Sequence, residues 1–200
     1  MSLLEDTKRM VEQATGLRRP KKRDLPDLLN PPRVNAFKFS DDGETPNNPN
    51  FPLLIYRAAI RLDPAFDRAA IFEELFASNG WKDAWRDGIY EFLHFHSSTH
   101  EVLGIARGHA SVEFGGNHGG TFTVRAGDVI VIPAGTGHCR NSASRDFLVV
   151  GAYPQAGEYD EPKPGEIDHA EAAAEIARAK APAKDPVFGR DGPMRQLWRL

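Results

Sequence analysis

The sequence predicts an all-β fold, an antiparallel sandwich or barrel, with a helix near each end of the chain. Between residues 88 and 153, short runs of β-branched, aromatic and leucine residues recur about every 8–12 residues. These predicted strands cover residues 90–96, 102–106, 110–114, 121–124, 129–132 and 147–153. Gly, Ser and Asn residues separate the runs, and no helical period lies between them. This pattern is typical of antiparallel sheets rather than of alternating strands and helices.

The composition is that of an ordinary globular protein with little net charge. The 200 residues include 25 Lys and Arg and 28 Asp and Glu, which gives a formal net charge of −3. This balance argues against nucleic acid or an acidic membrane surface as a partner bound through bulk charge. Cys139 is the single cysteine, which excludes an internal disulfide and any site built from paired cysteines. Apolar runs stay shorter than about 18 residues and the start does not resemble a signal peptide, so we expect a cytoplasmic protein without a membrane span.

Residues 1–30 are expected to form an N-terminal helix followed by a basic linker. Ser2 and Glu5 fit a capping box, apolar residues follow at helical spacing, and Gly16 can end the helix near residue 15. Residues 18–23 then place five cations in six positions, which is typical of a solvated linker. No aromatic residues are interleaved with these cations, so base stacking is not expected.

Residues 31–165 are expected to form the β domain. Pro, Asn and Asp divide its first part into short extended pieces at residues 36–39 and 53–57. Residues 67–79 are predicted to be a helix, because apolar side chains recur four positions apart and Gly80 follows. The predicted strands come next, and the glycine-rich residues 115–120 suit a hairpin loop between two of them.

Residues 166–200 are expected to add a C-terminal helix and a docking tail. Asp168 and Glu171 again fit a capping box, and an alanine-rich run continues to about residue 180. The tail beyond residue 185 contains Phe188, Leu197 and Trp198. Apolar side chains of this size favour docking on the β domain or on a second subunit over a free tail.

Two histidines and a glutamate are spaced as metal ligands. His94 and His96 are two positions apart, so on an extended strand their imidazoles point to the same side. Residues 97–99 have the composition of a turn, so Glu101 can open a returning strand and reach the pair. Neutral imidazoles and a carboxylate suit a divalent transition metal. The spacing alone leaves open a half-exposed histidine pair with Glu101 as a surface acid.

A second block adds a third histidine, and the two blocks together resemble the two motifs of the cupin superfamily. In the second block a predicted strand leads into a turn at Pro133 and Gly135, and His138 follows. The matching positions are Gly88, His94, His96, Glu101 and Gly108 in the first motif, and Gly127, Pro133, Gly135 and His138 in the second. The final Asn of the second motif departs from the pattern, because Asn141 comes one residue early.

The resemblance covers about residues 36–155, and some finer features lie partly outside that range. The strings at residues 46–49, 96–101 and 185–189 look like those of a bacterial group, the YjlB-like cupins. The resemblance implies a small antiparallel double-sheet β-barrel of the jelly-roll type. It also implies a homodimer, because cupins commonly dimerise.

The resemblance further implies a metal site inside the barrel. His94, His96, Glu101 and His138 would bind one divalent metal, which could be Fe, Mn, Ni or Zn. The function expected is that of a metal-dependent enzyme acting on a small polar organic molecule, with oxygenase-like chemistry ranked first. The alternative is a non-catalytic cupin, whose metal is structural or which binds or senses a small ligand.

Several other side chains are given roles by their position. Phe92 shares a face with the two histidines, Arg107 has the same parity as Glu101, and Asn141 follows the second motif, so all three are candidates for substrate binding. His100 is expected to point away from the metal, at the surface or beside the ligands. Cys139 is expected to be a small buried residue that faces away from His138. The remaining histidines, at positions 109, 118 and 169, are expected to be exposed.

Overall fold

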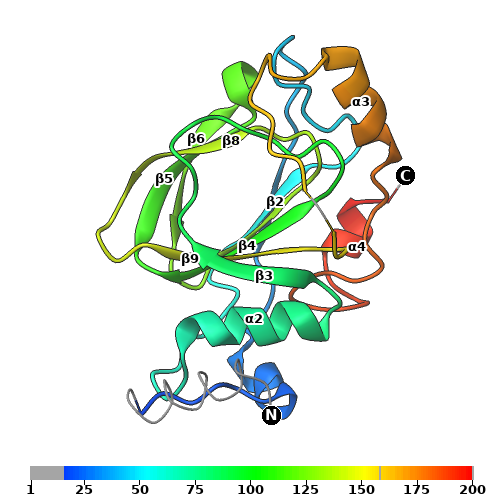
Figure 1. Cartoon of the computed structure of the whole chain (residues 1–200). Coiled ribbons are helices and arrows are strands. Elements are labelled where there is room, and N and C mark those ends of the chain that lie inside the picture. The colour runs from blue at the N-terminus through cyan, green and yellow to red at the C-terminus, as the bar shows by residue number, and fades with distance from the viewer. Residues whose placement is uncertain (1–15, 158, 200) are drawn as a thin grey trace.

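Two antiparallel sheets face each other in the computed structural model, which describes residues 16–157 and 159–199 (Figure 1). The larger sheet has six strands in the order β1-β2-β7-β4-β9-β3, and the smaller has three in the order β6-β5-β8. The strands are β1 (Val34–Phe37), β2 (Leu53–Tyr56), β3 (Lys82–Asp87), β4 (Glu101–Arg107), β5 (His109–Phe114), β6 (Gly120–Arg125), β7 (Val129–Ile132), β8 (His138–Ala143) and β9 (Leu148–Tyr153). The helices are η1 (Lys22–Leu28), α2 (Arg68–Ser78), η2 (Gly116–His118), α3 (His169–Arg178) and α4 (Met194–Leu197).

The central strands of the larger sheet are apolar along their whole length because both faces of the sheet are covered. In β4, Leu103 and Ile105 face the smaller sheet and belong to the core between the two sheets. Their neighbour Val102 belongs to the core on the outer face, where α2 packs. A sheet buried on both faces favours continuous apolar runs over alternation. Gly104 lets α2 approach, since a Cβ there would lie 2.2 Å from the Phe72 ring.

The double-sheet architecture is confirmed, but the expected barrel is not closed, since the two sheets remain separate in the described chain. Residues 90–96 were expected to be a strand, but only His94 forms a bridge, to His138. The other backbone bonds of this stretch are scattered, with Arg140 N donating to the Tyr90 carbonyl and Phe95 N donating to the Pro162 carbonyl. The segment therefore joins β8 at one bridge without forming a ladder.

The other predicted strands are confirmed within a residue or two, whereas β3 and β8 were missed. β3 is an edge strand of mostly charged residues that pairs only with β9, and β8 has polar residues at Arg140, Asn141 and Ser142. Polar edge strands lack the alternating apolar signal, because only part of their surface is buried.

The helix predicted at residues 67–79 is confirmed as α2, with Asp67 accepting a hydrogen bond from Ala69 N at 3.0 Å. In the stretch expected to be a solvated linker, Arg18, Lys21, Lys22 and Arg23 are exposed, and Arg19 pairs with Glu73 at 2.6 Å. η1 begins at its end, and the buried Leu25 and Leu28 of η1 pack against the core. The helix predicted to end near residue 15 lies outside the described residues. Each helix in the described part of the chain falls short of the length and apolar character needed to cross a membrane.

The C-terminal part of the chain contains the helix α3 and a tail that packs on the β domain. Asp168 caps α3 by accepting a hydrogen bond from Glu171 N at 2.9 Å. Trp198 is 2% exposed, stacks on Phe51 with ring centroids 5.0 Å apart, and donates from Nε1 to the Pro52 carbonyl. The tail therefore completes the hydrophobic core on the outer face of the larger sheet.

His100 joins this tail to the rest of the fold. The side chain is 2% exposed and its ring lies 4.8 Å from the Trp198 ring. Its Nδ1 accepts a hydrogen bond from Ala134 N at 2.9 Å, so the proton sits on Nε2, which donates to the Lys180 carbonyl at 3.2 Å. In the neutral ring, both nitrogens therefore make a hydrogen bond. Protonation of Nδ1 would break the bond from Ala134 N, because Nδ1 would then be a donor as well.

Acid is therefore expected to destabilise the fold through His100. Burial lowers the pKa of His100 to about 4, below its value of 6.5 when unfolded. A histidine whose pKa is lowered by folding contributes fully to the unfolding free energy above pH 6.5. This contribution, about 3 kcal/mol in total, is lost as the pH falls toward 4. Urea unfolding at pH 7, 5.5 and 4 should show a larger loss of unfolding free energy for the wild type than for His100→Gln. Equal losses in the two proteins would contradict this role.

Candidate metal centre

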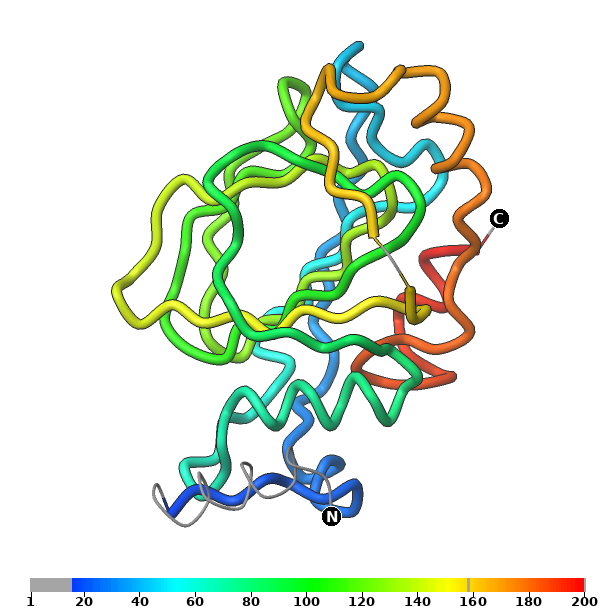
Figure 2. Tube along the Cα trace, viewed as in Figure 1, coloured from blue at the N-terminus to red at the C-terminus, as the bar shows by residue number. Residues whose placement is uncertain are grey.

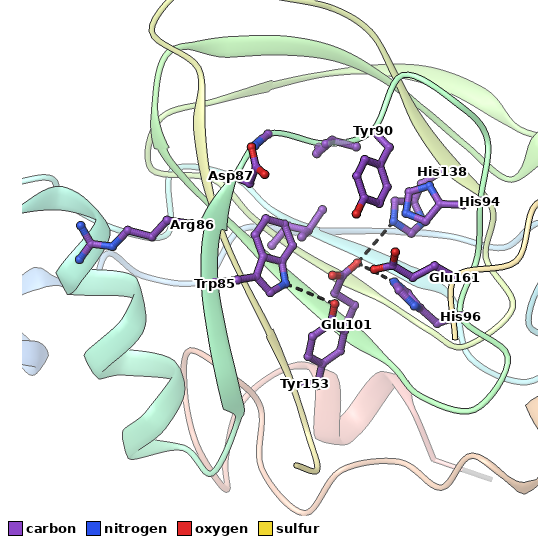
Figure 3. A pocket seen from close by; sticks show the side chains of 13 residues that line it. Trp85, Arg86, Asp87, Tyr90, His94, His96, Glu101, His138, Tyr153 and Glu161 are labelled. Atoms are coloured by element: carbon purple, nitrogen blue, oxygen red, sulfur yellow. Dashed lines mark hydrogen bonds and ion pairs between the residues drawn. The ribbon is translucent and has the colours of Figure 1, made fainter. Parts of the chain in front are cut away.

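The structure brings His94, His96 and His138 together with Glu101 in the interior (Figure 3). One ligand nitrogen of each histidine lies within 4.8 Å of the others. The Glu101 carboxylate oxygen Oε2 lies 3.4 Å from Nε2 of His96 and 3.4 Å from Nε2 of His138. Each of the four side chains is at most 4% exposed.

Backbone pairing fixes three of these residues at neighbouring positions. Glu101 is the first residue of β4 and pairs with Ile132, at the end of β7. The chain then turns and reaches His138, the first residue of β8. His138 N donates to the His94 carbonyl at 2.9 Å, and His94 N donates back to the His138 carbonyl at 3.3 Å. The two histidine rings consequently lie 4.1 Å apart, centroid to centroid.

The turn before His138 depends on Gly135. Its φ of +85° lies in the left-handed region, where a side chain is strained. A Cβ at this position would also lie 2.9 Å from the Asn47 carbonyl oxygen. Gly135 N donates to the His96 carbonyl at 2.7 Å, so the same glycine holds the His96 backbone in place.

The ring nitrogens that face away from the cluster are all tied to backbone carbonyls. Nδ1 of His94, His96 and His138 lies 3.2, 2.6 and 3.1 Å from the carbonyl oxygens of Phe92, Asp160 and Thr136, respectively. A carbonyl oxygen only accepts, so each Nδ1 carries a hydrogen and donates it. In a neutral imidazole this leaves the lone pair on Nε2. All three histidines thus have the tautomer that offers Nε2 to a metal.

The donor set fits a cation. Nε2 of His96 is buried and has no hydrogen-bond partner, although the Glu101 carboxylate is near. A buried polar atom without a partner is costly, and a ligand that fills the centre would remove that cost. Nitrogens and oxygens bound to one cation at about 2.1 Å are at most about 4.2 Å apart. The cluster is close to that spacing, so small side-chain shifts suffice to surround an ion.

Burial and mutual charge set the protonation of the cluster. Burial lowers the pKa of His94 to about 3, which keeps this ring neutral. Burial acts in the same direction on His96, but the Glu101 carboxylate outweighs it and raises the pKa of His96 to about 9. Burial would raise the pKa of Glu101, yet His96 and His138 hold it far below its usual range. The cluster therefore contains an ionised carboxylate beside a histidine that a cation would have to deprotonate.

The cluster lies in the wall of a cavity of about 260 Å³. Aromatic side chains line much of the remaining wall, namely Trp85, Tyr90 and Tyr153. The Tyr153 hydroxyl accepts a hydrogen bond from Trp85 Nε1 at 3.3 Å, and burial together with the Glu101 carboxylate raises its pKa. Glu161 is a further acid at this cavity, and its charge is the main cause of the raised pKa of Tyr90.

The segment around residue 160 (yellow-orange in Figure 2) runs close to the loop of residues 96–98 and was not assigned a role from the sequence. The Asp160 carboxylate accepts hydrogen bonds from Ser97 N at 2.9 Å and from the Ser98 hydroxyl at 2.7 Å. The Asp160 carbonyl meanwhile accepts from His96, so this residue orients one of the four clustered side chains. No spacing rule links residues 160 and 161 to the cluster, since a loop brings them there.

The structure leaves the three proposed substrate-binding residues outside the cavity wall. Phe92 is nearest, at the rim, with its ring stacked 4.7 Å from Tyr90 and 5.6 Å from the His94 ring. Arg107 ends β4, six positions beyond Glu101, and lines a different hollow with Phe66. Asn141 is exposed on β8, where its offset of three from His138 puts it on the other face. The placement of Arg107 and Asn141 does not support contact with a ligand at the cluster.

The remaining candidates mostly follow expectation. His100 points away from the cluster as predicted, but a surface position for it is wrong, because it is buried against the tail. Cys139 is 8% exposed, which confirms the prediction of a buried residue. His109 and His118 are exposed, and His169 is half-buried beside Asp41.

Comparison with known proteins agrees with this geometry. The family described as Cupin matches residues 86–162, a range that includes all four clustered residues, His94, His96, Glu101 and His138. The uncharacterized protein YjlB of Bacillus subtilis (strain 168) is 38% identical over 165 residues, which covers 82% of this chain and 96% of that protein.

Solved structures that match include an oxalate decarboxylase from Bacillus subtilis, with 18% identity and a TM-score of 0.33 over 68% of this chain. Procruciferin, an 11S globulin from Brassica napus, matches with 12% identity and a TM-score of 0.34 over 76% of this chain. The chain spans only 28% of the decarboxylase chain and 34% of the procruciferin chain. The relation to YjlB over most of both sequences, together with the family match, carries the assignment: this chain belongs to the cupins and is a YjlB-like cupin.

Proposed function

We propose that His94, His96, Glu101 and His138 hold one divalent cation and that the protein is a metal-dependent enzyme acting on a small polar organic molecule. One observation carries this proposal. The Nε2 atoms of three histidines and a buried carboxylate converge on one point, and that point lies in the wall of an open cavity. A metal that only stabilised the fold would not need a cavity beside it.

The ligand set suits Fe, Mn, Ni or Zn. When bound, such a cation would supply Lewis acidity, which polarises a substrate oxygen or activates water or O₂. Oxygenase-like chemistry ranks first among the reactions, because the cupin resemblance favours it. The homodimer, the cytoplasmic location and the domain boundaries near residues 30 and 165 stay predictions as well.

Residues of this chain would orient the ligands, offset the charge of the cation and line the cavity. The carbonyls of Phe92, Asp160 and Thr136 keep a hydrogen on each Nδ1, which holds the three Nε2 atoms free for the cation. The Glu101 carboxylate would offset part of the positive charge inside a buried site. Trp85, Tyr90 and Tyr153 form an apolar wall that limits the water around a bound molecule.

Water exchange at a paramagnetic metal separates a catalytic site from a structural one. Protein loaded with one equivalent of Mn²⁺ should speed the relaxation of water protons well beyond the same amount of free Mn²⁺, because a site open to the cavity keeps water on the ion. His96→Ala is the matched control, since it should leave the Mn²⁺ free. Stoichiometric Mn²⁺ without exchanging water would support the structural alternative and contradict an open catalytic site.

A further inference from the structure

We propose that the cavity selects a small organic cation, an amine that also carries an oxygen donor, and discriminates against organic acids. This inference rests on the proposed metal site and specifies which class of molecule that site takes. It follows from the side chains that surround the cluster and from how the nearby cationic groups are already used.

Acids and aromatic rings form the part of the cavity wall that is not the cluster. Glu161 and Asp87 both line it: Glu161 lies beside the histidines and Glu101, whereas Asp87 lies on the far side of Trp85 and Tyr90 (Figure 3). The Tyr90 ring lines the cavity, and Phe92 stacks on it at 4.7 Å. Aromatic faces and carboxylates both attract ammonium groups and offer nothing to a carboxylate.

Arg86 is the one arginine among the residues that line the cavity, and it is turned away from the centre (Figure 3). Its Nε lies 2.6 Å from Glu73 Oε1, and its Nη1 lies 2.8 Å from Asp67 Oδ2. Both acids belong to the α2 region outside the sheet, so the guanidinium is neutralised there.

Two further cations near the rim are also engaged. Arg140 donates to Glu91 at 2.6 Å and to the Ile89 carbonyl at 3.1 Å. The Lys163 ammonium lies 4.8 Å from the centre of the Phe92 ring and 3.6 Å from Glu166 Oε1. In the described part of the chain, the cavity therefore has no cationic side chain left for a substrate carboxylate.

The net charge of the metal-loaded cavity also favours an ammonium over a carboxylate. With one divalent cation bound and the histidines neutral, Glu101, Asp87 and Glu161 leave the cavity with a net charge of −1. A carboxylate ligand would increase this negative charge, whereas an ammonium would cancel it. Asp87 and Glu161 are exposed, so water and salt reduce the effect without reversing its sign.

The size of the cavity limits the ligand to roughly ten heavy atoms, since a cavity of about 150 Å³ holds benzene. Its volume of about 260 Å³ is below the range of about 300–1,000 Å³ that is usual for pockets that bind drug-sized molecules. A short molecule can place an oxygen at the metal and its ammonium near Glu161 and Tyr90.

Three hydroxamates with the same metal-binding head and different tails test the proposal. β-Alanine hydroxamate ends in an ammonium, propionohydroxamate in a methyl group and succinic monohydroxamate in a carboxylate. Calorimetric titration of the Mn²⁺-loaded protein at pH 7 should give affinities in that order, with at least a tenfold difference between the ammonium and the carboxylate compound. Glu161→Gln should reduce this ratio several-fold, while Glu171→Gln, an exposed acid on α3, should leave it unchanged.

The metal content of each sample keeps the two proposals apart. If the protein holds no metal, the proposed function fails. If metal is bound but the carboxylate compound binds as well as the ammonium compound or better, or none of the three binds, the cation preference alone is wrong. A preference for the ammonium that Glu161→Gln leaves unchanged would overturn the role given to Glu161 and the electrostatic argument with it.

Discussion

Replacing His96 by alanine is expected to remove most of the bound metal and to lower the melting temperature. The variant loses a fully buried clustered nitrogen that lacks a hydrogen-bond partner, and a metal bound only by the folded state stabilises that state. A metal present at about 1,000 times its Kd contributes about 4 kcal/mol. For a chain of this length that corresponds to a fall of roughly 10 °C. Elemental analysis of protein purified without chelators or a nickel column, followed by thermal melts, measures both effects.

The control for this experiment is His109→Ala. His109 is exposed on β5, away from the cluster, so this variant should retain the metal content and the melting temperature of the wild type. A His96→Ala protein with unchanged metal content would remove His96 from the site.

Replacing Asp185 by alanine is expected to cost at least about 4 kcal/mol of unfolding free energy. The Asp185 carboxylate is fully buried and accepts hydrogen bonds from the Tyr56 hydroxyl at 2.6 Å and from backbone N–H groups of the tail. These groups are Val187 N, Phe188 N and Met194 N, at 2.8, 2.9 and 3.0 Å. Each buried donor left without a partner costs about 1–3 kcal/mol. Urea unfolding of the variant and the wild type measures the difference.

Asp191→Ala provides the comparison for Asp185. Asp191 is exposed in the same tail, so its replacement should change the unfolding free energy by less than about 0.5 kcal/mol. The metal content of Asp185→Ala should stay near that of the wild type, because the tail packs on the outer face of the sheet. Equal stability of the two aspartate variants would show that the buried carboxylate does not anchor the tail.

The sequence was sufficient to predict which groups form the cluster. His94 and His96 share a side because of their spacing, and the turn at Pro133 and Gly135 returns the chain to His138. The structure adds the reason for one further string of the sequence, residues 46–49. Asn47 and Asn48 are buried and donate to the carbonyls of Gly115 and Ala134, so they tie the approach segment to the turns beside the cluster.

Other parts of the fold could not be predicted because their signals are not local. β3 and β8 carry too few apolar residues to show a period of two, and they form because β9 and β5 offer them edges. Residues 90–96 have the composition of a strand, but the partner ladder is missing except at His94. His100 follows a turn and reads as a surface residue, yet the tail, almost 100 positions later in the chain, covers it.

The residues of the cavity wall could not be predicted from local sequence either. Glu161 and Asp160 come from a loop more than 50 residues after the first motif, and only the folded chain places them beside His96 and Tyr90. Arg107 has the parity of Glu101, but a strand of seven residues carries it to the opposite end of the sheet. Parity along a strand predicts the face of a side chain and not its position along the strand.

Anomalous X-ray diffraction from crystals of the Mn²⁺- or Co²⁺-loaded protein tests the central claim most directly. The account predicts one strong peak, about 2.0–2.3 Å from Nε2 of His94, His96 and His138 and from a carboxylate oxygen of Glu101. A peak bound through the Nδ1 atoms, a peak elsewhere on the molecule, or no peak despite stoichiometric loading would contradict it.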